Sequence, residues 1–291
     1  MKAPPWTVKE LGRNVHVVEF EFKGKGDHAY VLLRSDAHHD NPSSLNDMEE
    51  EHLKQAKKRN APVIDNGDAF CAMQGKWDPR SDKSALKPEH QEDDYLDALV
   101  STYADFLKPY AKQLAVLGTG NHETSVLKRR ETNLTERLAE RLRVMAGFKG
   151  YTGSYTSWVF FRARCGKHGT RNTVKLWRTH GQGGGGPVTR GVIQSNRRAV
   201  YVPDANIIAS GHIHEEWIVP IQRVRVSQAG EVYQDEQTHI QIPSYKDSYK
   251  DGYSYGEWAI ERGMAPKPVG AMWLKFSFKE QRLSYEVERA K

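Results

Sequence analysis

The sequence predicts a mixed α/β fold, with strand–helix–strand units in its first half and mainly strands in its second half. Up to about residue 145, short apolar runs typical of buried strands alternate with longer amphipathic stretches typical of helices. From Tyr155 onward, strand-like runs follow one another with a single helical stretch between them. No repeat, low-complexity linker or change of composition marks a second domain, so one domain spanning residues 1–291 is expected.

The first strand–helix–strand unit is expected between residues 15 and 64. The runs 15–22 and 30–33 are predicted strands, and the stretch 44–60 is a predicted helix. Ser44 can cap this helix, and its acidic residues precede its basic ones, as the helix dipole favours. The short apolar run 62–64 is the next predicted strand and completes the unit.

Two further helices and one strand are expected before residue 146. Residues 71–88 are polar and irregular, which predicts a loop. The stretches 88–108 and 125–145 are predicted helices, the second with leucines at helical spacing. The apolar run 114–117 between them is a predicted strand.

The second half is expected to contain mainly strands. One helix is predicted at 188–200, because Pro187 precedes it at a position that suits the first turn. The Tyr-rich region 245–291 is expected to form a capping loop followed by the last two strands. The predicted strands of this half are 158–164, 173–177, 207–209, 217–226, 239–242, 271–278 and 282–287.

Composition favours a soluble globular protein. The hydrophobic fraction is 38% and the charged fraction 27%, and no apolar stretch approaches the roughly 20 residues needed to cross a bilayer. The first residues contain no apolar signal-like region, so a cytoplasmic protein is expected. Cys71 and Cys165 are too few for a disulfide framework or a thiolate metal site and are expected to be small buried residues.

The charge balance favours polyanionic partners. The net charge is +6 and the pI is near 9.1, and a positive field attracts molecules that carry phosphate. Basic clusters at 57–59, 128–130 and 197–198 lie in helical stretches, where solvated faces are expected. A nucleic acid or a nucleotide is therefore a reasonable partner.

Five short polar motifs each follow a short apolar run. Strand ends and the loops after them carry the chemistry of open α/β sheets, so these motifs predict a shared site. The motif at 120–123 follows the run 114–117 and is expected to be a strand end that delivers polar residues. The five motifs are Asp36-Ala37-His38, Gly67-Asp68, Gly120-Asn121-His122-Glu123, His180-Gly181 and Gly211-His212-Ile213-His214.

The polar residues of these motifs are typical metal ligands. Imidazole nitrogens mixed with carboxylates suit Zn, Mn or Fe, and seven ligands are too many for one ion. Two ions that share a carboxylate, about 3.5–4 Å apart, can clamp a phosphate and acidify a shared water. Only two of the seven are anionic, so the site is expected to stay electropositive. The seven candidate ligands are Asp36, His38, Asp68, Asn121, His180, His212 and His214.

The ordered set of motifs resembles the calcineurin-like metallophosphoesterase superfamily, whose pattern is DxH, GDxxD, GNH(E/D), a later His and GHxH. All five blocks occur between residues 36 and 214. The layout also resembles uncharacterised phosphoesterases carried by phages. The resemblance implies a four-layer αββα sandwich, with two central mixed sheets flanked by helices, and two divalent or mixed-valence ions. It implies that Asp36, His38 and His214 hold one ion, that Asn121, His180 and His212 hold the other, and that Asp68 bridges them.

The resemblance also implies a catalytic role for His122, beside Asp68. His122 matches the residue that contacts the phosphate and protonates the leaving oxygen in many members. Their GDxxD motif would place an Asp where this chain has Cys71, and a neutral thiol cannot raise the basicity of an imidazole as a carboxylate would. His122 is therefore expected to be a weaker general acid, or to borrow the carboxylate of Asp65 or Glu123.

His39 leaves the register of the first motif open. The DxH spacing favours His38 over His39, because side chains two residues apart point the same way from an extended segment. Residues 183–186, all glycine, are expected to form a flexible loop; the alternative is backbone that approaches a phosphate.

The motifs and the charge together favour a dinuclear metal-dependent phosphoesterase that hydrolyses phosphodiester bonds by attack of a metal-bound hydroxide. The alternatives are a DNA or RNA nuclease, a phosphomonoesterase or nucleotide phosphatase, and, outside enzymes, a noncatalytic metal-bound binding module. The expected partners are a phosphate-ester substrate, with nucleic acid or nucleotide among the options, and a second copy of the chain through the Tyr-rich C-terminal region. No membrane partner is expected.

Overall fold

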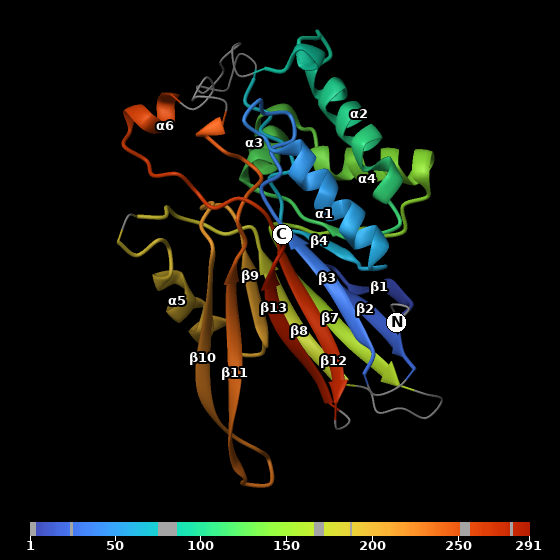
Figure 1. Ribbon diagram of the computed structural model, residues 1–291, viewed down its shortest axis with the longest axis vertical. Helices are drawn as coiled ribbons and strands as arrows, with labels where there is room; N and C mark the ends of the chain where they lie inside the picture. Colours follow the sequence, from blue (N-terminus) through green and yellow to red (C-terminus); the bar gives the residue numbers. More distant parts are fainter. Residues whose placement is uncertain are drawn as a thin grey trace.

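Two β-sheets lie face to face at the centre of the molecule (Figure 1). The computed structural model describes residues 4–23, 26–74, 86–165, 172–186, 188–250, 257–279 and 282–291. The seven-stranded sheet has the order β1-β2-β7-β8-β9-β11-β10, and the six-stranded sheet has the order β13-β12-β3-β4-β5-β6. The strands of the seven-stranded sheet are β1 (Trp6–Gly12), β2 (Val15–Phe22), β7 (Thr156–Cys165), β8 (Asn172–Thr179), β9 (Ile207–Ser210), β10 (Trp217–Val226) and β11 (Val232–Gln241). Those of the six-stranded sheet are β3 (His28–Arg34), β4 (Val63–Asp65), β5 (Leu114–Leu117), β6 (Tyr151–Thr152), β12 (Met272–Lys279) and β13 (Arg282–Arg289).

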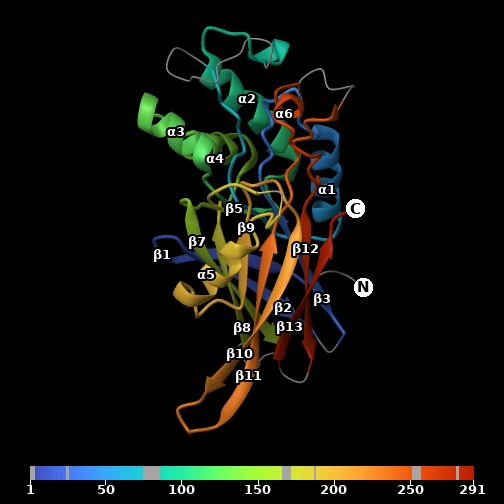
Figure 2. The same ribbon diagram turned by 90° about the vertical axis from the view of Figure 1, so that its left-hand side faces the viewer.

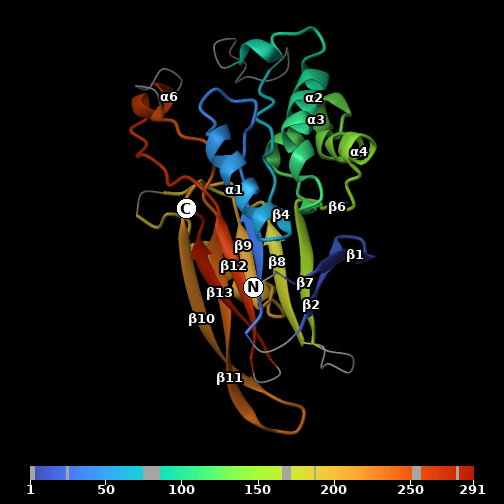
Figure 3. The same ribbon diagram turned by 45° about the vertical axis from the view of Figure 1, so that its right-hand side comes forward.

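Helices lie on both outer sides of the two sheets. Helices α1 to α4 gather on the side of the six-stranded sheet (Figures 1 and 3), and α5 lies apart from them against the seven-stranded sheet (Figure 2). The helices are α1 (Asn46–Lys58), α2 (Tyr95–Leu107), α3 (Asn121–Arg130), α4 (Leu134–Ala146), α5 (Ile193–Tyr201) and the short α6 (Glu257–Glu261), with 3₁₀ turns η2 at Pro88–His90 and η3 at Lys108–Tyr110.

Three apolar clusters hold the layers together. Alternate residues of a strand point to opposite faces, so Val31 of β3 packs with Phe161 in the cluster between the sheets, while Leu32 packs with Leu53 of α1. A smaller cluster around Ile208 lies beneath α5. These layers confirm the predicted αββα sandwich with two mixed sheets.

Strand direction sets where the polar motifs emerge. β3, β4, β5 and β6 pair in parallel, and so do β8 and β9. The carboxyl ends of parallel strands meet at one edge of a sheet, so the segments after β3, β4, β5, β8 and β9 can converge there.

The predicted helix 125–145 is two helices. α3 ends at Arg130, Glu131 adopts a left-handed φ of 53°, and the side chain of Asn133 caps α4 by accepting a hydrogen bond from the Glu136 N–H at 3.1 Å. Apolar residues recur at helical spacing on both sides of this break, so the periodicity alone did not show it.

The prediction for 88–108 was also too simple. Pro88 to His90 forms only a 3₁₀ turn, and the α-helix begins at Tyr95.

Ser44 does not cap α1, whose N-cap is Leu45; the Ser44 hydroxyl instead donates to the carbonyl of Ala37 at 2.6 Å. The strands 15–22, 114–117 and 217–226 have their predicted ends, and the other predicted strands and helices are present with shifted ends, whereas β1, β6 and α6 were not predicted.

The cluster at 197–198 departs from the expected solvated face, and so does Arg59, whose guanidinium carbon lies 4.5 Å from the ring centroids of Tyr30 and Trp273. Arg198 of α5 is buried and donates a hydrogen bond to the Ser210 hydroxyl at 2.8 Å, whereas its neighbour Arg197 is exposed. Cys71 is buried, as expected, and the side chain of Cys165 lies outside the described residues.

Parts of two other predicted regions also lie outside the described residues. They are 75–85 of the loop predicted at 71–88 and 251–256 of the Tyr-rich region, together with Pro187 before the predicted helix. Among the described residues, none of the helices combines the length and apolarity that a membrane crossing requires.

Candidate active site

The five polar motifs converge at one edge of the sandwich. Both sheets contribute, because a side chain that follows β8 lies against one that follows β5: His180 Nε2 is 2.9 Å from Asn121 Oδ1. The structure therefore brings all seven candidate ligands into one site, with contacts that join the segments after β3, β4, β5, β8 and β9.

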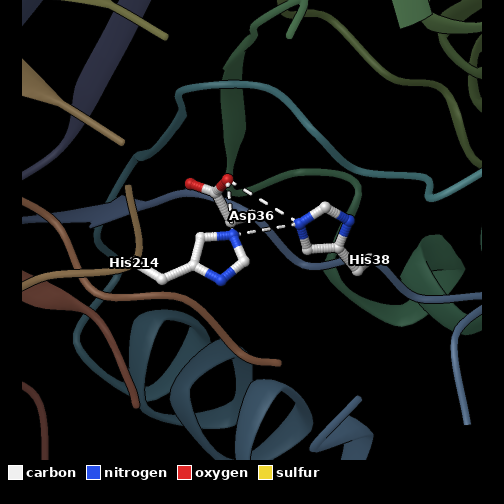
Figure 4. A group of neighbouring side chains, drawn as sticks. All are labelled: Asp36, His38 and His214. Carbon is white, nitrogen blue, oxygen red and sulfur yellow. Dashed lines mark hydrogen bonds and ion pairs between the residues drawn. The ribbon is translucent and has the colours of Figure 1, made fainter. Parts of the chain in front are cut away.

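The first candidate metal group consists of Asp36, His38 and His214, whose side chains point toward one another (Figure 4). Asp36 Oδ1 lies 3.2 Å from His214 Nε2 and 3.7 Å from His38 Nε2, and the two imidazole nitrogens are 3.3 Å apart. Asp36 Oδ1 is buried and has no hydrogen-bond partner among the described residues. A buried, unsatisfied carboxylate oxygen between two imidazole nitrogens fits a divalent cation.

The second group consists of Asp68, His180 and His212, with Asn121 beside it. Asp68 Oδ2 lies 3.1 Å from His180 Nε2. His180 Nδ1 lies 3.0 Å from the carbonyl oxygen of Asn66. A carbonyl only accepts, so Nδ1 carries a proton, and Nε2 is the nitrogen that would coordinate a bound cation.

Asp68 lies between the two groups. It belongs to the second group and also to a third set of mutually close donors formed with His38 and His122. His38 is itself a member of the first group. This placement is the one a bridging carboxylate requires.

Strained backbone conformations are concentrated at the candidate ligands. Ten non-glycine residues of the described chain have positive φ, and five of them are Asp36, His38, Asp68, His212 and His214. Such conformations persist only where surrounding contacts enforce them, and they cluster at functional sites. The strain therefore marks the same residues that the motifs predicted.

The charges in the site favour a cation. Burial works against ionised Asp36 and Asp68, yet neighbouring imidazoles, His180 foremost, hold the pKa of both carboxyls well below the usual range. Burial alone would lower the pKa of His180, but the carboxylates of Asp68 and Asp36 raise it to about 9. Burial lowers the pKa of His38 to about 4. Two ionised carboxylates thus face one group of imidazoles. These imidazoles would be neutral with a cation bound, because a histidine must lose its second proton to coordinate a metal.

The register of the first motif is settled by the contacts of His39. Its Nδ1 lies 3.4 Å from Glu49 Oε2, and its ring stacks on Tyr103 with centroids 4.4 Å apart. His39 thus faces the helices, and His38 faces the candidate ligands, as predicted, although the segment is not extended, since Asp36 and His38 both have positive φ.

The motif at 120–123 is not a strand end, contrary to the prediction. β5 ends at Leu117, and Asn121 and His122 are the first residues of helix α3. The carboxylate of Glu123 accepts the Gly120 N–H at 2.7 Å and fixes this helix start. The Asp68 carboxylate accepts the His122 N–H at 3.0 Å, so the helix N-terminus faces an anion, as its dipole favours.

His122 is oriented by a carbonyl rather than by a carboxylate. Its Nδ1 donates to the carbonyl oxygen of Cys71 at 2.5 Å, and its Nε2 lies 3.8 Å from Asp68 Oδ2. The Cys71 thiol points elsewhere, with Sγ 3.2 Å from His38 Nδ1, and burial raises the pKa of this thiol to about 12.

The hypothesis that the His122 ring is oriented by the carboxylate of Asp65 or Glu123 is wrong. Asp65 pairs with Arg34, its Oδ2 lying 2.8 Å from Arg34 Nε. Glu123 accepts the backbone N–H groups of Asp68 and Phe70, each at 3.1 Å, besides that of Gly120. Both carboxylates shape the loops of the site and do not touch the His122 ring.

Three further residues lie at the site, besides the seven candidate ligands and His122. The Lys87 ammonium donates to the His39 carbonyl at 2.6 Å, and Lys246 Nζ lies 3.9 Å from Cys71 Sγ. The Asp40 carboxylate accepts two backbone N–H groups of the segment that holds His122. None belongs to a spacing pattern, and the signal for Asp40 is its place two residues after His38, directly after the first motif.

Comparisons with known proteins find likeness in structure alone. No family model matches the chain, and no curated protein resembles it in sequence. Vacuolar Protein Sorting 29 from Cryptosporidium parvum is 12% identical over 91% of this chain and 98% of its own, with a TM-score of 0.39. An uncharacterized predicted phosphoesterase from Streptococcus pneumoniae is 12% identical over 91% and 90%, with a TM-score of 0.34. GAP50 from the inner membrane complex of Plasmodium is 11% identical over 91% and 84%, with a TM-score of 0.41.

These likenesses are too distant to establish a family or an activity. No TM-score among the three reaches 0.5, so we infer neither from them. What the chain can do chemically follows from the convergence of its own ligand-type side chains at the end of the two sheets.

Proposed function

We propose that this protein is a dinuclear metal-dependent phosphoesterase that acts on phosphodiester bonds. One observation carries the proposal: two groups of candidate ligands share the neighbourhood of Asp68, and His122 lies against the same carboxylate. A single structural ion would need about four ligands and no adjacent free imidazole. The proposed ligands are Asp36, His38 and His214 for one ion, Asn121, His180 and His212 for the other, and Asp68 for both.

The donor set limits the choice of metal. Imidazole nitrogens, carboxylates and one amide oxygen suit Mn, Zn or Fe better than Mg or Ca. When bound, two such ions supply Lewis acidity, which withdraws charge from the phosphoryl oxygens and acidifies water near the phosphorus.

His122 supplies the proton that the leaving group needs. In the hydrolysis of a diester, a water oxygen forms the new bond to phosphorus, and the bond from phosphorus to the leaving oxygen breaks with its electron pair on that oxygen. The carbonyl of Cys71 holds one proton on Nδ1 of His122, so Nε2 is the atom that faces the site, and in the imidazolium form of the ring the second proton, on Nε2, passes to the leaving oxygen. The attacking water gives up its own proton to solvent, from which the ring then recovers one.

The surroundings of the site support an anionic ester as substrate. The Lys246 ammonium lies beside Cys71 and Lys87 beside His39, and the whole chain carries a net charge of +6. Such a field raises the local concentration of phosphate-bearing molecules. A nucleic acid or a nucleotide is the substrate class that this charge favours.

The test is a metal-reconstituted activity screen. Protein loaded with Mn, Zn, Co or Fe is assayed on phosphate mono-, di- and triesters and on single- and double-stranded DNA and RNA. We expect hydrolysis of diesters, and we expect the Asp68→Asn variant to lose it by about 100-fold or more while also holding less metal. If the substrate is a polymer, its binding should weaken steeply with salt, whereas binding of a mononucleotide should not.

Two results would contradict the proposal. Wild-type activity that survives intact in Asp68→Asn would place the chemistry elsewhere. Metal-loaded protein that hydrolyses no ester but binds a partner tightly would favour the noncatalytic binding module.

A further inference from the structure

The peptide between Cys71 and Ala72 lies between His122 and a buried carboxylate. On one side, the Cys71 carbonyl accepts the hydrogen bond from His122 Nδ1 at 2.5 Å. On the other side, the Ala72 N–H donates to Asp40 Oδ2 at 2.9 Å. A trans peptide is planar and its C=O and N–H point in opposite directions, so whatever fixes this N–H also fixes the direction of the carbonyl.

Both carboxylate oxygens of Asp40 accept hydrogen bonds from this segment. Its Oδ1 accepts the Cys71 N–H at 2.6 Å, while Oδ2 takes the Ala72 N–H. Two successive N–H groups that converge on one anion form a concave nest, and Ala72 has a left-handed φ of 47° within it. Hydrogen bonds to a charged acceptor are roughly twice as strong as neutral ones, which offsets the strain at Ala72.

Asp40 is itself held in place. It is 4% exposed, and the Tyr95 hydroxyl lies 3.4 Å from its Oδ2. It follows His38 by two residues, and the His38 N–H donates to the carbonyl of Asp68 at 3.0 Å. The carboxylate is thus anchored to the same backbone that carries the candidate ligands.

We propose that Asp40 is a positioning residue for His122, acting through the Cys71–Ala72 peptide. This inference rests on the proposed function, in which His122 is the general acid. The structure shows a carboxylate that reaches His122 through one intervening peptide. Asp40 sets the angle of the His122 ring and keeps one proton on Nδ1, so that the second proton of the imidazolium lies on Nε2 and faces the leaving oxygen.

The test uses Asp40→Asn and two diesters that differ in their leaving group. An asparagine side chain keeps the shape of Asp40 but has one acceptor oxygen, so it cannot satisfy both N–H groups. Nitrophenolate leaves without a proton, whereas an alkoxide requires one. We expect kcat for an alkyl or nucleoside diester to fall about 10- to 100-fold, with kcat and KM for bis-p-nitrophenyl phosphate nearly unchanged.

Two comparison variants sharpen the result. His122→Gln should show the same dependence on leaving group, because it removes the proton donor itself. Asp47→Asn removes an equal charge at an exposed position in the first turn of α1 and should match wild type on both substrates. An Asp40→Asn variant that loses activity equally on both diesters, or on neither, overturns the proposal.

A second measurement separates this proposal from the proposed function. Nitrogen-15 NMR of the histidine rings in metal-free protein reports which nitrogen of His122 carries the proton. We expect the Nδ1-protonated form in wild type and a loss of that preference in Asp40→Asn; an unchanged His122 signal overturns the proposal even if wild type hydrolyses no ester. If Asp40→Asn does not fold, Asp40→Glu, which keeps the charge with a displaced carboxylate, is expected to shift the same signal.

Discussion

Glycines of the polar motifs let the strained loops of the site approach one another. A Cβ added to Gly120 would lie 2.7 Å from Asp68 Cγ, and one added to Gly211 would lie 2.8 Å from Ser35 Cβ. Real Cβ atoms do not tolerate such contacts, so Asp68 can sit against the start of α3 only because residue 120 has no side chain. At the scale of single residues, these motifs therefore specify packing as well as chemistry.

We expect Gly120→Ala to weaken metal binding by at least about 10-fold, because the new methyl group must displace Asp68 from its place between the two ligand groups. The measurement is the metal retained per protein after dialysis, with circular dichroism to confirm the fold. Gly12→Ala is the matched control, since a Cβ there meets nothing within 4 Å. Equal metal content in Gly120→Ala and Gly12→Ala would refute this account of the motif glycine.

At the scale of elements, the sequence predicted the strands that have a long periodic apolar pattern. It missed the features that depend on contacts between residues far apart in the chain. The strands 15–22 and 217–226 were predicted with their observed ends, because their patterns are long and their faces differ in burial. β6 has two residues and forms by pairing with β5, so it leaves no local signal. The convergence of the motifs was predictable because each follows an apolar run. The hydrogen bonds of the Cys71 carbonyl to His122 and of the Ala72 N–H to Asp40 were not, since a backbone hydrogen bond leaves no pattern in a sequence.

The break between α3 and α4 gives a prediction at this scale. Asn133 accepts the Glu136 N–H, and replacing such a cap by alanine typically costs about 1 kcal/mol. We therefore expect Asn133→Ala to lower the free energy of unfolding by about that amount in urea titrations, and Asn133→Asp, which keeps the acceptor, to change it little. Equal losses in the two variants would show that the cap does not stabilise α4.

At the scale of the whole molecule, buried polar groups join the layers. Arg34 of β3 is fully buried and pairs with Glu49 of α1 and Asp65 of β4, which ties the helices to the six-stranded sheet behind the candidate site. Removing one member of such a network leaves an uncompensated buried charge and is strongly destabilising. Asp65 also accepts the Gly67 N–H at 2.8 Å, so this network holds the loop that carries Asp68.

Buried histidines outside the site make the whole fold sensitive to acid. His16 of β2 is fully buried, and neither ring nitrogen has a hydrogen-bond partner among the described residues. Burial, with the nearby charge of Arg178, lowers its pKa from 6.5 to about 4. Because the unfolded chain binds this proton more readily, the contribution of neutral His16 to stability is complete above about pH 6.5 and is lost as the pH falls toward 4.

We therefore expect His16→Phe to reduce the acid sensitivity of the fold. Between about pH 7 and pH 5, wild type should lose up to about 2 kcal/mol more unfolding free energy than the variant, since one unit of pKa shift corresponds to about 1.4 kcal/mol. The other titrating groups, those of the candidate site among them, contribute equally to both proteins and cancel in the difference. Urea titrations at the two pH values measure it, and a titration near pH 8, where the histidine is neutral in both states, isolates the effect of packing the phenyl ring. Parallel stability curves for the two proteins from pH 8 to pH 5 would mean that His16 is protonated as readily in the fold as in the unfolded chain, and that its burial has no energetic consequence for protonation.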